Sequence, residues 1–334
     1  MIALSKRFVC TADEVWRLQR GSEADCIFFQ KMVNGGKRIT DRGSRQGTWI
    51  CAPSGKVLAR TGSRDVEKFL EAMESGLARW DELPPEDKRI PEGTDLTPKH
   101  RWEMNYPDGG LALERIVREL SPEGLAAEPA ERWSRDMAWF TREEVASWIP
   151  SDVTEGMTFE LPMFAKRLAR FHLVDNARGQ TLPYADTEIE AATLQAEVTS
   201  RDGQRIALKL AGTTRAEAGG PWALGQNLWK PSRDLPHAIR CDLVGQATFD
   251  LEARRFVQFE LVSVGRRQGR TQMNGRGRDE RESSLLAFHL ELAPESMRIA
   301  PTFIGVYDAD WVLAPAVPTW LESPEECGLQ SNGR

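Results

Sequence analysis

Apolar and polar residues alternate along several stretches in the second half of the chain. One alternating run covers 194–198 and another covers 206–210, with the pair Asp202-Gly203 between them. A period of two indicates strands that bury one face, and Asp-Gly between two such runs favours a tight hairpin turn. Together with further runs of this kind, the pattern predicts at least five strands in an antiparallel sheet that is half-buried or barrel-like. The apolar positions of these strands are Leu194, Ala196, Val198, Ile206, Leu208, Leu210, Val257, Phe259, Leu261, Leu286, Phe288, Leu290 and Leu292.

The first 82 residues show a mixed pattern. Apolar residues at helical spacing over 13–33, interrupted at Gly21, predict two short helices or one broken helix. A short aromatic and β-branched run at 8–10 predicts a strand. Two further runs, Thr48–Cys51 and 56–59, flank a Pro-Ser-Gly turn and predict an antiparallel hairpin.

A longer amphipathic stretch follows the hairpin. Over 63–80 the apolar residues stand at i, i+3, i+4 and i+7, which predicts a helix with one apolar face and with Ser63 as its N-cap. We expect that face to pack on the hairpin, because each of the two elements leaves one apolar side to bury.

The organisation of the chain follows from these patterns. The segment 83–98 is rich in proline and charge and has no periodicity, which indicates a linker. It separates a first domain over 1–82 from a second, mainly antiparallel β domain over 99–325, so the fold class expected is α+β. A Trp-rich segment is expected to cover the sheet of the second domain, and it contains Trp102, Trp133, Trp139 and Trp148.

The order of elements in residues 1–82 resembles the later part of a thioredoxin-like domain. RFVC matches the strand after the family's redox helix, TWICAPSGKVLA the following hairpin, and VEKFLEAMESGLARW the closing helix. The resemblance implies an α/β domain and makes Cys10 and Cys51 weak redox candidates. The chain as a whole resembles an uncharacterised planctomycete-type bacterial family, which implies no function.

Two landmarks of the thioredoxin-like family are missing. No CxxC occurs, and Gln46 stands where the family has a cis-proline. The family's first strand would lie upstream of Phe8 and between the strands that carry Cys10 and Cys51, so we expect two free thiols. One interpretation is a degenerate or truncated domain, and the alternative is a start upstream of Met1 that carries the CxxC. As written, the N-terminus predicts a cytoplasmic protein, whereas an upstream start leaves an extracytoplasmic location open.

Composition narrows the range of functions. The net charge of −6 gives no general attraction for nucleic acid, and no nucleic-acid partner is expected. No apolar run approaches the ~20 residues of a membrane helix, so a transmembrane protein is not expected. The five cysteines and four histidines are scattered without metal-ligand spacing, and neither a metal nor another cofactor is expected.

The densest cluster of candidate chemistry is the stretch VGRRQGRTQMNGRGRDERES. Guanidinium forks and backbone N–H groups freed by glycine could hold a phosphate or a carboxylate. The alternative is a solvated connection between two strands, partly neutralised by Asp279, Glu280 and Glu282. The anion-binding candidates are Arg266, Arg267, Arg270, Asn274, Arg276 and Arg278.

A second polar group occurs in HLVDNARGQ. His172 and Asp175 could form an acid–base pair on one helical face. Alternatively, Asp175 and Asn176 turn the chain before Gly179. No catalytic residue is assigned.

The sequence thus predicts a non-catalytic binding or assembly protein whose partner would be another protein. One alternative is a thiol-disulfide oxidoreductase whose CxxC lies upstream. The other is a β domain, enzyme or ligand binder, that acts on an anion through residues 266–278.

Overall fold

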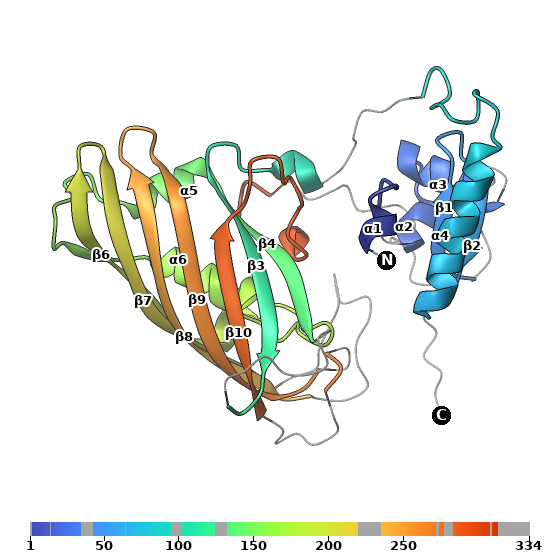
Figure 1. Cartoon of the computed structure of the whole chain (residues 1–334). Helices are drawn as coiled ribbons and strands as arrows, with labels where there is room; N and C mark the ends of the chain where they lie inside the picture. The colour runs from blue at the N-terminus through green and yellow to red at the C-terminus, as the bar shows by residue number, and fades with distance from the viewer. Residues whose placement is uncertain are drawn as a thin grey trace. The chain divides into compact units, whose positions relative to one another are not determined.

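The described residues of the computed structural model form two compact units (Figure 1). The first unit holds the described residues up to 94, and the second holds those from 102 onward. The described residues are 2–13, 15–34, 43–63, 65–94, 102–123, 132–219, 235–271, 274–276, 283–307 and 309–312.

The first unit packs a helix on a hairpin. Its elements are α1 (Ile2–Ser5), α2 (Val15–Arg20), α3 (Ala24–Asn34), β1 (Thr48–Cys51), β2 (Val57–Thr61) and α4 (Val66–Asp81). β1 and β2 pair antiparallel, and Ile50 and Leu58 of the hairpin are buried together with Met73 of α4. The predicted hairpin, the helix over it and the two helices within 13–33 are confirmed. The N-cap of α4 is Asp65, which accepts hydrogen bonds from two backbone N–H groups of the first turn, so the prediction of Ser63 as the cap is wrong.

The strand predicted at 8–10 is also wrong. The chain turns there after α1, and Val9 is fully exposed. A run this short has too little apolar surface to hold a strand without a neighbour to pair with. Among the described residues the first unit has only the two-stranded sheet β1-β2, so RFVC does not support the thioredoxin-like resemblance.

The second unit is built on a wide antiparallel sheet. The order of its described strands is β4-β3-β10-β9-β8-β7-β6-β5, and every neighbouring pair is antiparallel. The sheet is open, with β4 and β5 at its edges. The predicted α+β class and antiparallel sheet are therefore confirmed. The strands are β3 (Leu111–Leu120), β4 (Trp133–Phe140), β5 (Thr158–Glu160), β6 (Ile189–Asp202), β7 (Arg205–Ala218), β8 (His237–Asp250), β9 (Arg255–Gly269) and β10 (Ser283–Leu292).

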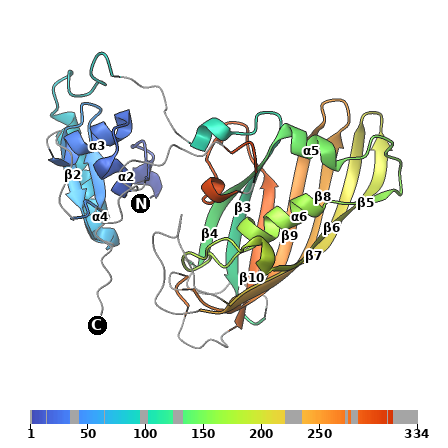
Figure 2. The same cartoon turned by 180° about the vertical axis from the view of Figure 1, so that it is seen from behind.

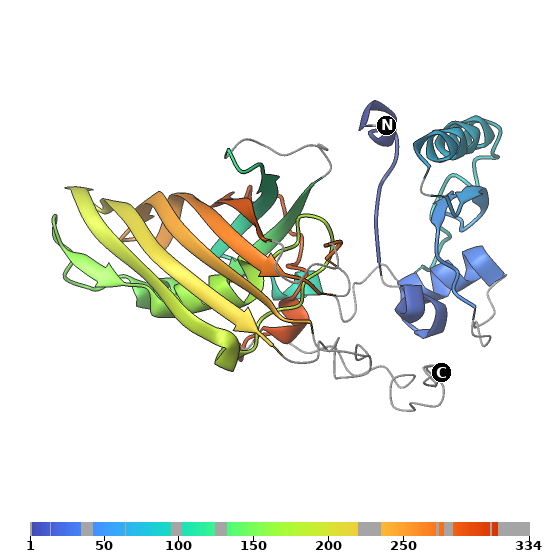
Figure 3. The same cartoon turned by 90° about the horizontal axis from the view of Figure 1, so that it is seen from below.

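Helices cover one face of this sheet. Figure 2 shows α5 (Arg142–Trp148) and α6 (Pro162–Arg167) lying across the strands, and Figure 3 shows the sheet curving around them. A π-helix, η2 (Leu168–His172), continues α6. We call the helix-covered side the inner face and the opposite side the outer face. The remaining helical turns are η1 (Trp102–Asn105), η3 (Asp186–Glu188) and η4 (Ile304–Val306). None of the described helices is long and apolar enough to cross a membrane.

The core lies between the inner face and the helices. Alternation turns about every second side chain of β6 to β10 inward, and the apolar ones among them join one hydrophobic cluster with Phe164 and Leu168 of the helical segment. The inward position near the start of β9 is Phe256 rather than the predicted Val257, because a bulge there shifts the register against β8. The apolar alternation was thus interpreted correctly except at this bulge.

The tryptophans of the middle segment do not all cover the sheet. Trp133 and Trp139 belong to β4 and are part of the sheet itself, which the sequence did not predict. Trp148 does lie in the covering layer, where its ring stacks on Phe164 at a centroid distance of 4.9 Å. Trp102, Trp139 and Trp148 therefore pack in or against the core, whereas Trp133 remains half-exposed.

Long connections gather at one end of the sheet. The turns at 203–204 and 251–254 close the other end with few residues. The connections 121–132, 219–236 and 270–282 all leave from the end where β3, β7 and β9 finish. We call this the long-loop end. Binding residues concentrate on loops that a rigid scaffold holds, so this end is where a site is expected.

Candidate functional site

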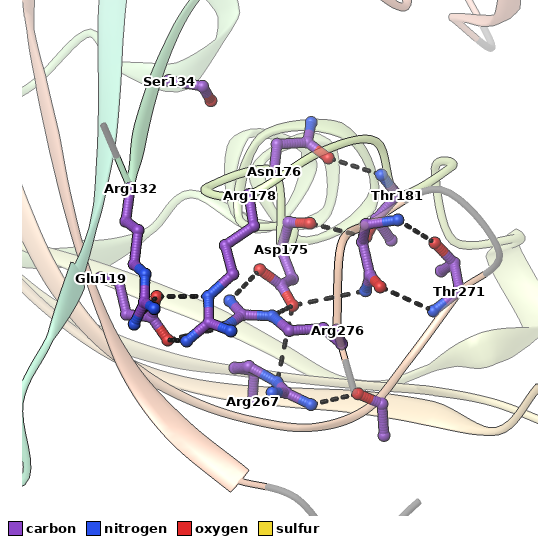
Figure 4. A network of polar contacts seen from close by, with 12 residues as sticks. Glu119, Arg132, Ser134, Asp175, Asn176, Arg178, Thr181, Arg267, Thr271 and Arg276 are labelled. Atoms are coloured by element: carbon purple, nitrogen blue, oxygen red, sulfur yellow. Dashed lines mark hydrogen bonds and ion pairs between the residues drawn. The ribbon is translucent and has the colours of Figure 1, made fainter. Parts of the chain in front are cut away.

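A buried network of charged side chains lies on the inner side of the long-loop end (Figure 4). Its two carboxylates are Glu119, near the end of β3, and Asp175, which follows η2. Arg178 binds Glu119 in a bidentate manner, donating from Nε at 2.6 Å and from Nη2 at 2.7 Å. Arg276 bridges both acids, donating to Glu119 at 2.6 Å and to Asp175 at 2.6 and 2.8 Å.

Two further arginines face the same carboxylates. Arg132 lies 3.7 Å from Glu119, and Arg267 lies 3.5 Å from Asp175. Among the described residues, four guanidinium groups thus lie against these two carboxylates. The side chains of Arg267 and Arg276 are buried, whereas those of Arg132 and Arg178 are 34% and 23% exposed.

Local hydrogen bonds within residues 271–276 position Arg276 beside Glu119 and Asp175. Thr271 and Asn274 bond each other reciprocally, each backbone N–H donating to the other's side-chain oxygen at 3.1 Å. Asn274 also donates to Asp175 from its amide at 3.4 Å. Gly275 has φ of +67°, and a Cβ there would meet the carbonyl oxygen of Arg178 at 2.8 Å. Glycine is therefore required at this position for the close approach of the two segments.

The same polar contacts hold the segment after η2 in place. Thr181 donates from its hydroxyl to the carbonyl oxygen of Asp175 at 2.7 Å, and its backbone N–H donates to the amide oxygen of Asn176, also at 2.7 Å. These bonds confirm that Asn176 helps to turn the chain. The carboxylate of Asp175 is held instead by Asn274 and Arg276.

Electrostatics keep the network ionised. Burial alone would raise the pKa of Glu119, but hydrogen bonds from Arg178 and Arg276 outweigh it and hold that pKa below its ordinary value. Burial lowers the pKa of Arg276, yet its bonds to Asp175 and Glu119 raise it overall. Neither group changes its protonation near neutral pH, so the network provides fixed charge and geometry rather than proton transfer.

The predicted anion-binding residues divide in space. Arg267, Asn274 and Arg276 enter the network, whereas Arg266 points to the outer face. Arg270 follows β9 and donates its backbone N–H to the carbonyl oxygen of Pro236 at 3.3 Å. Arg278 lies outside the described residues.

Sequence reasoning missed Glu119 and Arg132. The signal was present in the alternation along β3, where Leu113, Val117 and Glu119 share the inner face. A charged residue at an apolar position of a strand marks a buried ionic partner. That signal becomes visible only once the segment is recognised as a strand.

His172 and Asp175 do not form the acid–base pair considered from the sequence. Asp175 is held by Arg276, and the Nε2 of His172 lies 2.6 Å from the hydroxyl oxygen of Tyr307. Burial, with the nearby charges of Arg115 and Arg167, holds the pKa of His172 well below its ordinary value. The imidazole is therefore neutral at neutral pH and is enclosed in the core.

The cysteine candidates lie in the first unit as free thiols. Cys10 is exposed, and Cys51 is half-buried, where desolvation raises the pKa of its thiol. The free state agrees with the expectation from the sequence, although the strand spacing used to derive it does not exist at Cys10.

Metal ligands do not cluster in the described part of the chain. There, no group of three or more His, Cys, Asp or Glu side chains could hold a metal ion. Comparison of the chain with protein-family models, with curated proteins and with solved structures finds no match.

Proposed function

We propose that the second unit is a non-catalytic binding module that takes a carboxylate- or phosphate-bearing ligand at the long-loop end of its sheet. The observation that carries this proposal is that two partly exposed guanidinium groups, those of Arg132 and Arg178, lie together against Glu119 at the edge of the network of Figure 4. Arginine presents a planar fork of donors that matches the oxygens of both anions.

The rim of the network is the part available to a ligand. Each nitrogen of the Arg276 guanidinium donates to Glu119 or Asp175, so this side chain serves as the buried base of the site. Arg132 makes only a loose contact with Glu119 at 3.7 Å and is partly exposed. Arg178 commits Nε and Nη2 to Glu119, which leaves its remaining N–H groups for an incoming oxygen. An anion would therefore bind against Arg132 and Arg178.

Binding is favoured over catalysis by the state of the titratable groups. A general acid or base works best with a pKa near the operating pH. The pKa of Glu119 lies below its ordinary range and that of Arg276 above it. His172 is enclosed and its Nε2 contacts Tyr307.

For the first unit we propose only a partial thioredoxin-like architecture without thiol chemistry. The hairpin β1-β2 under α4 supports that proposal. Thiolate is the reactive form of cysteine, and burial raises the pKa of the Cys51 thiol and disfavours it.

Isothermal titration of the full chain with inorganic phosphate and with acetate, at low ionic strength, tests the anion site. We expect saturable binding that weakens about tenfold or more in Arg132→Gln, the loss of about one charge-assisted hydrogen bond. Arg205→Gln is the matched control, because it removes the same charge from the opposite end of the sheet. Absence of binding to the wild-type chain would refute the proposal, and so would equal loss in the two variants.

A further inference from the structure

Like charges face one another across neighbouring strands on the outer face. The register places Arg215 of β7 opposite Arg240 of β8, and Arg240 opposite Arg266 of β9. These three residues form one row, which we call the arginine row. Like charges directly opposite in a sheet are destabilising, so such a row calls for an explanation beyond the fold.

A second row carries the opposite charge. Glu260 of β9 lies opposite Glu291 of β10, and Glu291 lies opposite Glu114 of β3. We call this the glutamate row. Glu260 and Glu291 are exposed, whereas Glu114 is mostly covered and pairs with Arg135 at 2.5 Å.

Exposed valines separate the two rows. Along β9 the outward side chains run Arg266, Val264, Val262 and Glu260. At about 3.3 Å per residue, the two charged ends of this series lie about 20 Å apart. Val262 faces Val244 of β8, and these three valines are 39–63% exposed. The outer face over β8 and β9 therefore carries exposed valines between a positive and a negative side, and Asp242 of β8, which is also exposed, lies opposite Val264 among them.

Half of the six charged residues in the two rows make no ion pair within the described part of the chain. Arg240 and Arg266 make no ion pair within the described part of the chain, and Glu291 makes none there either. Arg215 pairs with Glu190 at 2.6 Å. Figure 1 looks onto this face, and the helices of the second unit lie behind the strands.

We propose that this face binds the same face of a second copy of the chain. A two-fold axis lying in the interface, at right angles to the line from Arg240 to Glu291, the middle residues of the two rows, exchanges the two rows. It places Arg240 on the partner's Glu291, with the rest of each arginine row near the partner's glutamate row and the valines near valines. An isologous contact requires such self-complementarity, and charge complementarity selects this pairing over one in which like rows meet. Hydrogen bonds from Gln246 and His289 to Glu260 keep its pKa low, so the negative side persists at neutral pH.

Charge reversal tests the pairing in the full chain. By sedimentation velocity we expect a wild-type dimer that dissociates on dilution and weakens as salt rises. The variants R240E and E291R each place like charges against like in both halves of the symmetric contact, and each should be monomeric where the wild type is dimeric. An equimolar mixture of R240E with E291R restores opposite charges in both halves and should form a heterodimer.

Controls separate this result from misfolding and from the anion site. R205E reverses an exposed arginine of β7 at the short-turn end, outside the two rows, and should remain dimeric. All variants should keep a urea midpoint close to or above that of the wild type, and R240E should keep the wild-type phosphate affinity because Arg240 is not in the network of Figure 4. A wild-type chain that stays monomeric at high concentration would overturn the proposal, whether another protein or the first unit occupies the face. A mixture of R240E and E291R that fails to associate would overturn it as well.

Discussion

The two faces of the large sheet treat charge in opposite ways. On the inner face, Glu119 is buried and surrounded by arginines of three separate segments. On the outer face, Glu291 of β10 is exposed and lies between two other glutamates, Glu260 and Glu114. Burial makes the difference: a charge removed from water must be paired, whereas high dielectric at the surface tolerates like charges at small cost.

This contrast separates two roles for arginine in one domain. Arg276 and Arg267 have their side chains buried and tie distant segments together. Arg240 and Arg266 are exposed and contribute little to holding the monomer together. Substitutions on the inner face should therefore change stability, and those on the outer face should change association.

The largest effect is expected from Arg276→Met. Removing this side chain leaves Glu119 and Asp175 buried with fewer partners, and breaking a buried ion pair costs about 3–5 kcal/mol. Urea unfolding followed by the far-UV strand signal measures it, with Arg205→Met as an exposed control that should cost no more than about 1 kcal/mol. Equal destabilisation by the two variants would erase the distinction between the faces.

The pH dependence of stability should also depend on Glu119. Its folded-state pKa is lowered, so its contribution is fully present above the unfolded value of about 4.3 and is lost as pH falls through the folded value. The wild type should therefore lose more stability than Glu119→Gln as the pH falls from neutral to below the unfolded value, and urea midpoints measured at a series of pH values test this. Glu260→Gln on the outer face should differ less from wild type, because water screens that side chain. If the urea midpoints of wild type and Glu119→Gln fall equally steeply as the pH is lowered, Glu119 is not held by its arginines.

The smallest effect is expected from Arg240→Gln, and it has the opposite sign. Neutralising the middle of the arginine row relieves repulsion toward Arg215 and Arg266, so the free energy of unfolding of the monomer should rise by about 0.3 kcal/mol. The same variant should weaken the dimer. Urea unfolding at low concentration and sedimentation at high concentration measure the two quantities separately. A loss of stability would show that the row supports the fold.

The strands of the large sheet differed in how far the sequence predicted them. The alternation in β6 to β10 specified these strands because one face of each is buried along its length. β3 was missed because LALERIVREL is rich in leucine, glutamate and arginine, which favour helices. Pairing with β10 on one side and β4 on the other overrides that preference.

The candidate site was predicted only in part for a similar reason. The concentration of arginine and glycine drew attention to Arg267, Asn274 and Arg276. Their acid partners, Glu119 and Asp175, lie far away in the sequence, and nothing local links them. The sequence could therefore indicate which polar residues lie on strands, but not which of them pair with one another in the folded protein.

The sequence by itself determined which residues alternate, where turns occur and how each strand or helix distributes its apolar side, because these follow from local backbone geometry. It therefore specified the hairpin of the first unit, the helix over it and the strands β6 to β10. Only the tertiary structure decided that β3 and β4 join the sheet, that Glu119 meets Arg276, and that arginines gather in one row and glutamates in another. Those outcomes depend on strand order and register, which bring together residues whose separation along the chain carries no local signal.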